Sequence, residues 1–180
     1  MLRRNPEDIE AIAMIGFLYI KTDDIEKGIG QLKIAEKFKK PDSDFFFKFA
    51  MTIKDVPGQE GQAERLLKRA IKTNPDHIEA LSQLGMLYEK QDRIEEAIKY
   101  FKLATKIPKQ SPFAHYSLGL NFLKLKDQEN AEFHFRQCIL ADKSHFGACF
   151  NLGLICFAKK DFLKSEKLFK NCIKLFPNSI

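Results

Sequence analysis

Glycine, proline and cysteine are all scarce in this sequence. Among 180 residues there are nine glycines, seven prolines and four cysteines. The low glycine and proline content excludes collagen-like and linker sequences, and four cysteines are far too few for a disulfide-stapled scaffold. Hydrophobic residues make up 44% of the chain and charged residues 30%. This is enough apolar material to build a core, so an intrinsically disordered chain is excluded as well.

Long hydrophobic segments are also missing. The longest stretch without a charged residue runs from Ser144 to Ala158, which is too short to span a bilayer. Acidic residues and Pro6 near the start of the chain argue against a cleavable secretory signal, and no Asn-x-Ser/Thr acceptor occurs. We therefore expect reduced thiols and an intracellular, cytoplasmic protein, with a ciliary or nuclear complex left open.

No catalytic motif is present. The sequence has no phosphate-binding G-x-x-x-x-G-K-[ST], no G-x-G-x-x-G, no H-E-x-x-H and no G-x-S-x-G. Cys149 and Cys156 are seven residues apart on one helix face, but zinc requires four convergent ligands, so small buried cysteines are the simpler interpretation. We expect no enzyme activity, no cofactor and no metal, and structural roles for the scattered histidines His77, His115, His134 and His145.

The net charge of +6 is concentrated near the end of the chain. Residues 146–180 contain six lysines and two acidic residues. Four of these lysines recur at helical spacing and form a basic stripe: Lys160, Lys164, Lys167 and Lys174. The stripe would suit an acidic protein, nucleic acid or a membrane surface. The competing interpretation is an ordinary solvated helix face, and no nucleic-acid-binding motif accompanies the stripe.

A period of 34 residues runs through the chain. Leu84-Gly85, Leu118-Gly119 and Leu152-Gly153 are 34 residues apart, and Ile15-Gly16 lies two periods plus one residue before Gly85. The missing copy is a degenerate Ala50-Met51. The period predicts five units, over residues 9–43, 44–77, 78–111, 112–145 and 146–180.

Each unit contains two successive stretches of helical period. In the third unit Leu84 and Tyr88 lie on the face of one helix, and Ala97 and Phe101 on that of a second. Aspartates between the stretches are expected to cap the second helices: Asp23, Asp92, Asp127 and Asp161. Prolines are expected to stop them: Pro75, Pro108 and Pro177.

These columns resemble the tetratricopeptide repeat, a 34-residue helix–turn–helix. The third unit matches at Leu84-Gly85, Tyr88, Ala97, Phe101 and a displaced Pro108, whereas the second unit has Lys54 in the tyrosine column. The resemblance implies an all-α protein, an α-solenoid with a right-handed superhelix. Stacked hairpins would bury a continuous core, with the glycine and small-residue columns at close helix approaches and the first helices lining a concave face.

The two ends of the chain predict a further neighbour. Residues 1–8 are similar to the tail of a preceding repeat, because Leu2–Pro6 mirrors Ile71–Pro75, and no polar capping helix follows the fifth unit. Terminal repeats normally need such a cap. We expect either a segment of a longer solenoid or ends that a partner covers, including end-to-end self-association.

The resemblance also predicts where a partner would bind. In this family, partner peptides usually lie along exposed positions of the first helices. In the fourth and fifth units these positions are largely apolar: Phe113, Tyr116, Leu120, Leu123, Lys124, Phe150, Leu154 and Phe157. They predict a groove for an amphipathic helix or an extended apolar segment, with Lys124 at its rim. The competing interpretation is that further chain or tight superhelical curvature covers these residues.

A subclass of the family clamps the acidic tails of chaperones with Lys, Asn and Arg in fixed columns. Those columns here carry residues such as Phe17, Gln83 and Leu120, so acidic chaperone tails are not expected as partners. We expect a non-catalytic protein–protein interaction scaffold in a multisubunit assembly. Two alternatives stay open: a substrate-recognition domain of a larger enzyme such as a transferase, and nucleic-acid association through the basic fifth unit.

Overall fold

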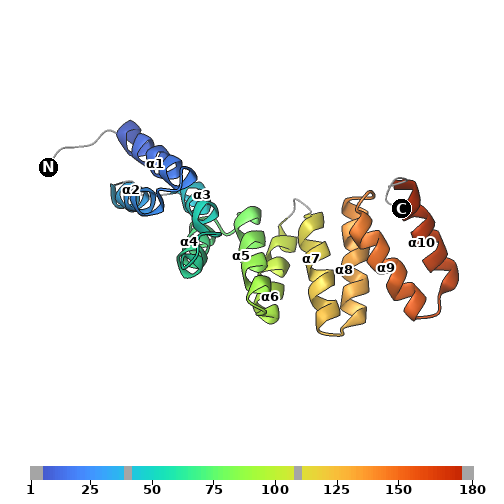
Figure 1. The fold of residues 1–180 in the computed structure, drawn as a ribbon. Helices are drawn as coiled ribbons and strands as arrows, with labels where there is room; N and C mark the ends of the chain where they lie inside the picture. The colour runs from blue at the N-terminus through green and yellow to red at the C-terminus, as the bar shows by residue number, and fades with distance from the viewer. Residues whose placement is uncertain (1–5, 39–41, 108–110, 176–180) are drawn as a thin grey trace. The chain divides into compact units, whose positions relative to one another are not determined.

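The structure is a computed structural model that describes residues 6–38, 42–107 and 111–175. These residues form ten α-helices and no strand (Figure 1). The helices are α1 (Pro6–Lys21), α2 (Ile25–Phe38), α3 (Ser43–Ile53), α4 (Glu60–Thr73), α5 (Ile78–Lys90), α6 (Ile94–Lys106), α7 (Pro112–Lys124), α8 (Gln128–Ala141), α9 (Phe146–Ala158) and α10 (Phe162–Leu175). An all-α protein of consecutive helices was expected from the sequence and is confirmed.

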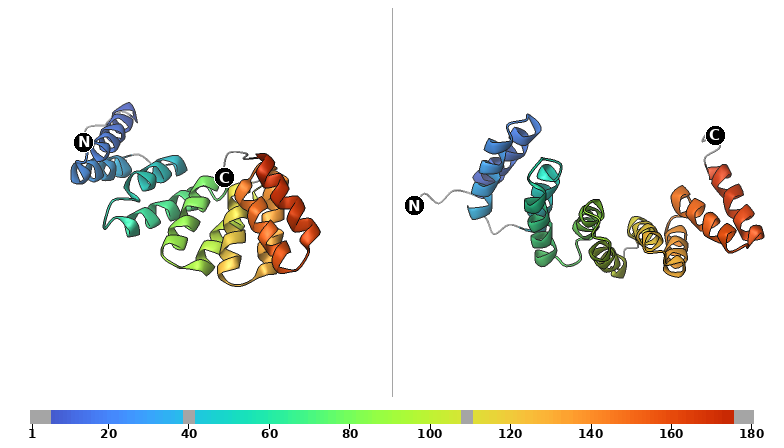
Figure 2. Two further views of the ribbon diagram at one scale, coloured as in Figure 1. Left: turned by 45° about the vertical axis from the view of Figure 1, so that its right-hand side comes forward. Right: turned by 60° about the horizontal axis from the view of Figure 1, so that its bottom comes forward.

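The helices pack as sequential hairpins within two compact units, Met1–Ala80 and Leu81–Ile180. In the first unit α1 packs on α2 and α3 on α4. In the second unit α7 packs on α8 and α9 on α10, and α6 and α8 also contact the helix that follows them (Figure 2). The rings of Tyr88 on α5 and Tyr100 on α6 stack at 5.5 Å. Two helices fall within each of the five predicted intervals, whose boundaries stay predictions.

The glycine column lies where two helices of a hairpin touch. A Cβ added to Gly119 would lie 2.5 Å from the ring of Phe135, and at Gly85 and Gly153 the corresponding distances to Phe101 and Phe169 are 2.8 and 2.7 Å. In the first hairpin a Cβ on Gly16 would meet Leu32 at 2.8 Å. The predicted close approaches are therefore confirmed, and they arise because an aromatic or leucine side chain of the second helix lies flat on the first.

The turns inside the hairpins share one left-handed residue. A positive φ occurs at Asp23, Gly58, Asp92, Lys126 and Lys160, which are equivalent positions of the repeat. The predicted caps are confirmed one residue further on in the fourth and fifth hairpins, where Asp127 and Asp161 accept the backbone N–H groups of Asn130 and Lys164.

The predicted caps at Asp23 and Asp92 are wrong. Both residues have a left-handed backbone, with φ of 67° and 58°, and precede the cap position. Arg93 occupies that position before α6 and makes no capping hydrogen bond; its guanidinium instead pairs with Glu96 and lies 4.2 Å from the centre of the Tyr88 ring.

The prolines differ in their relation to the helices. Pro75 follows the end of α4, as predicted, whereas Pro108 and Pro177 lie outside the described residues. Residues 6–8, expected to form part of a repeat tail, instead belong to α1, which begins at Pro6. The physical reason is that proline, with its fixed φ and missing N–H, suits the first position of a helix as well as the residue after one.

Candidate partner-binding surface

The predicted groove residues lie on α7 and α9, which contact each other in the second unit. Their spacing of three or four residues places them on one face of each helix. Phe113, Phe150, Leu154 and Phe157 are exposed, with Phe157 the most exposed at 58%. Tyr116, Leu120 and Leu123 are half-buried. The apolar surface is therefore contributed mainly by two rings and a leucine of α9, with Phe113 at the start of α7.

Tyr116 joins two hairpins. Its ring centre lies 4.5 Å from that of His145 and 5.9 Å from that of Phe135. A Cβ added to Gly147 would lie 2.7 Å from the tyrosine oxygen. Gly147 is one period after Phe113, so the missing side chain on α9 leaves the space that Tyr116 fills. Most of this side chain is consequently committed to packing within the protein.

The exposed rings are supported from below. The Phe113 ring makes an edge contact with buried Phe101 at 6.1 Å, and the Phe150 ring lies 5.6 Å from Phe169. The Phe157 ring is in edge contact with Phe162 at 5.5 Å. Such contacts restrict the rotamers of the exposed rings before any partner arrives.

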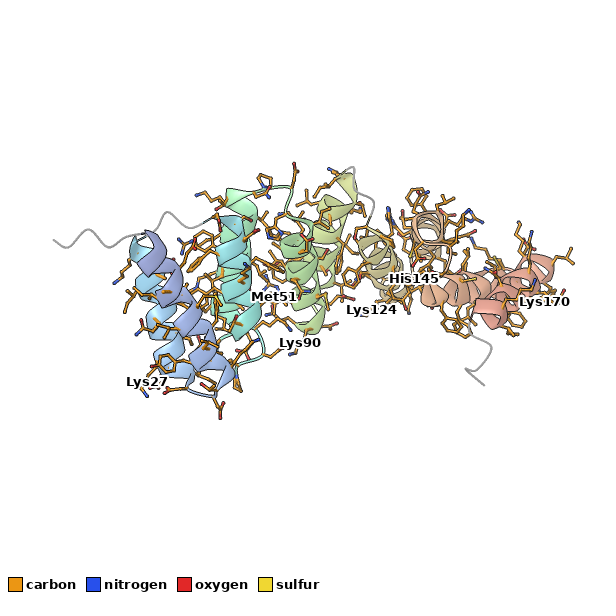
Figure 3. All side chains as sticks on the ribbon, turned by 90° about the horizontal axis from the view of Figure 1, so that it is seen from above. Lys27, Met51, Lys90, Lys124, His145 and Lys170 are labelled. Carbon is orange, nitrogen blue, oxygen red and sulfur yellow. The ribbon has the colours of Figure 1, made fainter. Side chains whose placement is uncertain are left out.

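Phe146 extends the row and was missed from the sequence. It is exposed and stacks on Phe150 at 5.8 Å. The signal was present, because Phe146, Phe150 and Leu154 follow each other at intervals of four residues. At the opposite end, Lys124 Nζ lies 3.6 Å from Glu89 Oε1 on α5 (Lys124 is labelled in Figure 3), so the cation at the rim is paired.

Three of the four histidines have structural roles at helix starts or in the hairpin core. His77 and His145 accept the N–H groups of Ala80 and Ala148 through Nδ1. His115 and His134 bring their Nδ1 atoms to 3.1 Å between α7 and α8. Burial lowers the pKa of His115. Burial, together with His115 and Lys102, lowers the pKa of His134 to about 4. Both rings are therefore neutral at physiological pH.

All four cysteines are free and buried. Burial raises the pKa of the Cys138 thiol to about 12, and burial together with the neighbouring Cys149 does the same for Cys172. Among the residues that the structure describes, no three His, Cys, Asp or Glu side chains gather where they could hold a metal ion. The thiols fill space as small apolar groups.

Three of the four predicted stripe lysines line one hollow of about 740 Å³ against α10: Lys164, Lys167 and Lys174. Lys160 does not line it, because it occupies the left-handed turn. Arg136 and Lys170 also line the hollow and were missed from the sequence. Lys164 and Lys170 are paired with Asp161 and Glu166 at 2.7 and 2.6 Å.

The helix lengths and compositions bear on membrane insertion. Within the described ranges, no helix is both long enough and apolar enough to cross a bilayer.

Two curated relatives each match about two thirds of the chain. The tetratricopeptide repeat-containing protein trd-1 of Caenorhabditis elegans is 28% identical over 122 residues, which are 67% of this chain and 15% of that protein. Anaphase-promoting complex subunit 3 of Schizosaccharomyces pombe is 24% identical over 121 residues, 67% of this chain and 18% of the relative. The chain thus spans less than a fifth of the length of either relative.

Solved structures share the fold. A crystal structure of MamA protein has a TM-score of 0.79 at 21% identity and covers 95% of this chain and 93% of its own. YrrB, described as a TPR protein with an unusual peptide-binding site, has a TM-score of 0.72 at 16% identity and covers 97% and 90%. Tetratricopeptide repeats are matched over residues 58–118, 114–145 and 146–179. With the hairpins and the glycine column, these matches establish that the chain belongs to the tetratricopeptide repeat family.

Proposed function

We propose that this chain is a non-catalytic scaffold that binds an apolar segment of a protein partner along α7 and α9, within a multisubunit assembly. The observation that carries the proposal is the row of exposed rings on α9, Phe146, Phe150 and Phe157, with Leu154 between them. Contiguous exposed apolar surface is unusual on a soluble domain and commonly marks an interaction site.

The contacts beneath the row favour binding. Phe150 and Phe113 rest on the rings of Phe169 and Phe101, so little side-chain entropy is lost when a partner docks. Exposed aromatic anchors with such support are typical of binding hot spots. The row is one helix face long, which suits an amphipathic helix or an extended segment with alternating apolar side chains.

The relatives are consistent with this proposal at a coarse level. Tetratricopeptide repeats are protein-interaction modules, one relative is named as a subunit of a complex, and YrrB is described as having a peptide-binding site. Because the chain spans only a small share of its relatives, a substrate-recognition domain of a larger enzyme such as a transferase stays the alternative. Both versions place the partner on the same helices.

Peptide selection tests the proposed groove. Peptides selected on the wild-type protein from a displayed library should contain apolar residues at helical or alternating spacing. Their affinity should fall at least about tenfold for Phe113→Asp/Phe157→Asp. Leu140→Asp is the matched control, since Leu140 is an exposed apolar residue on α8. Unchanged affinity in the double variant, with circular dichroism showing intact helices, would contradict the proposal.

The basic hollow supports a second candidate, an anionic partner such as nucleic acid or an acidic protein segment. Lys167 and Lys174 line it, and within the described residues neither makes an ion pair. Binding there should weaken steeply with salt. A Lys167→Glu/Lys174→Glu variant should lose this binding and keep the affinity for apolar peptides. Salt-independent binding of a single-stranded oligonucleotide would count against this candidate.

A further inference from the structure

α1 exposes a row of side chains whose equivalents elsewhere are buried. The row consists of Ala11, Ile15, Leu18 and Tyr19; the last three are 44%, 57% and 36% exposed. The equivalent residues of α7 and α9 are at most 7% exposed: Ala114, Leu118, Asn121, Phe122, Ala148, Leu152, Ile155 and Cys156. The exposure of α1 is therefore a property of its position in the array and not of the repeat.

The equivalent faces are covered by the second helix of the hairpin before them. α6 packs on α7, and α8 packs on α9. Lys102 Nζ of α6 lies 5.3 Å from the centre of the Phe122 ring, and Lys159 after α9 donates to Glu132 of α8 at 2.5 Å. Within the described residues no helix precedes α1. Its exposed face therefore fits the second helix of a hairpin of this repeat.

α10 carries the complementary stripe. On α8 the stripe that faces the next hairpin consists of Glu132, Phe135, Arg136 and Ile139, and its equivalents on α10 are Glu166, Phe169, Lys170 and Ile173. The side chain of Glu132 is 14% exposed and that of Glu166 is 59% exposed. Phe135 is fully buried and Phe169 half-buried, while Ile173 is exposed. The stripe on α10 is thus available for a first helix.

We propose that copies of this chain associate head to tail, with the α10 stripe of one copy packed on the α1 face of the next. The register follows from the repeat. Lys170 takes the place of Lys102 and lies over Tyr19, which takes the place of Phe122 (Lys170 is labelled in Figure 3). Glu166 takes the place of Glu132 and comes near Lys21, one residue from the position equivalent to Lys159. Such a contact uses two different surfaces, so it adds copies in series.

Two interface variants and their mixture test the proposal by sedimentation velocity. The wild-type protein should form dimers and longer species as its concentration rises. Leu18→Glu blocks the α1 face and Ile173→Glu blocks the α10 stripe, and each should weaken self-association at least about tenfold. Mixing the two should restore a dimer and nothing larger, because only one intact contact remains. Leu140→Glu on α8 should assemble like the wild type.

Three results would overturn the proposal. The first is a wild-type protein that stays monomeric at every concentration, as expected if a hairpin of another chain covers α1. The second is loss of assembly in Leu18→Glu alone with no recovery in the mixture, which indicates an α1-to-α1 contact. The third is unchanged assembly in both variants. Leu18 and Ile173 are both more than half exposed, so circular dichroism should show both variants folded.

Discussion

At the scale of single residues, Lys126 and Lys160 occupy a backbone conformation that suits glycine better than lysine. Their φ angles are 59° and 61°, and the equivalent turn residue of the second hairpin is a glycine. A left-handed backbone costs a residue with a Cβ about 1–2 kcal/mol. These two turns therefore hold strain that the rest of each hairpin overcomes.

Replacing either lysine by glycine should stabilise the protein. We expect Lys126→Gly and Lys160→Gly each to raise the free energy of unfolding by about 0.5–1 kcal/mol, the relief of strain being partly offset by the greater freedom of glycine in the unfolded chain. Urea denaturation measures the change. The control is Lys33→Gly inside α2, which should lower stability by about 1 kcal/mol. Destabilisation by the turn variants would show that the lysine side chains make compensating contacts.

The His115–His134 pair predicts an acid-sensitive stability. The pKa values of both histidines are lowered in the folded protein, that of His134 to about 4. The unfolded chain therefore takes up protons below about pH 6.5 while the folded protein does not, and stability falls as the pH drops from there towards 4. Urea denaturation at about pH 7 and about pH 5 should show a loss of about 1–2 kcal/mol attributable to His134.

The control for this titration is His134→Gln, which lacks the ionisable group and should lose less stability over the same interval. Lys102 on α6 also bears on the pair, since its charge opposes protonation of His134. Equal losses in the wild type and the variant would show that other groups cause the acid sensitivity. A chemical-shift titration of His134 gives the pKa directly.

At the scale of elements, each hairpin depends on a flat ring against a bare helix face. Gly119 is the tightest case in the second unit, and Phe135 is fully buried, so its ring has no free space to move into. Gly61 on α4 provides a contrast, because no atom lies within 4 Å of a Cβ added there. Two glycines in helices thus have opposite roles.

Alanine substitutions should separate those roles. Gly119→Ala should lower the free energy of unfolding by about 1–3 kcal/mol, because the added methyl group overpacks the α7–α8 contact. Gly61→Ala should raise it by about 0.5–1 kcal/mol through helix propensity. Thermal or urea unfolding of both variants measures the pair. A neutral Gly119→Ala would mean that α7 and α8 can move apart at little cost.

The helices and their packing columns could be predicted because the period repeats each residue's environment several times. The same period could have corrected the capping prediction: Asp92 is 34 residues before Lys126, whereas the cap Asp127 corresponds to Arg93. The site was less predictable. The inward packing of Tyr116 depends on Gly147 of the next hairpin, and the hollow lined by Arg136 depends on neighbouring helices. Such contacts between units of the pattern are not written in its period.

At the scale of the whole molecule, the thiols are distributed unevenly. All four lie in the second unit, buried, and the first unit has none. The raised pKa values of Cys138 and Cys172 keep these side chains as thiols, which are far less reactive than thiolates. Thiol reactivity therefore depends on opening of the second unit.

Ellman's reagent should react slowly with the native protein and with four thiols after denaturation in urea. As urea increases, labelling should follow the unfolding of the second unit, whatever the state of the first. Hydrogen exchange of α9 and α10 amides provides the independent measure of that opening. Rapid labelling of one thiol in native buffer would contradict the burial of that cysteine.

The placement of the cysteines also sets how this protein ages in an oxidising environment. Because the sulfur atoms are reached only through openings of the second unit, strong oxidants should act at a rate that no longer depends on their concentration. The opening frequency of one unit would then be the clock for thiol oxidation of the entire chain. The first unit would keep its chemistry unchanged while its neighbour acquired the damage.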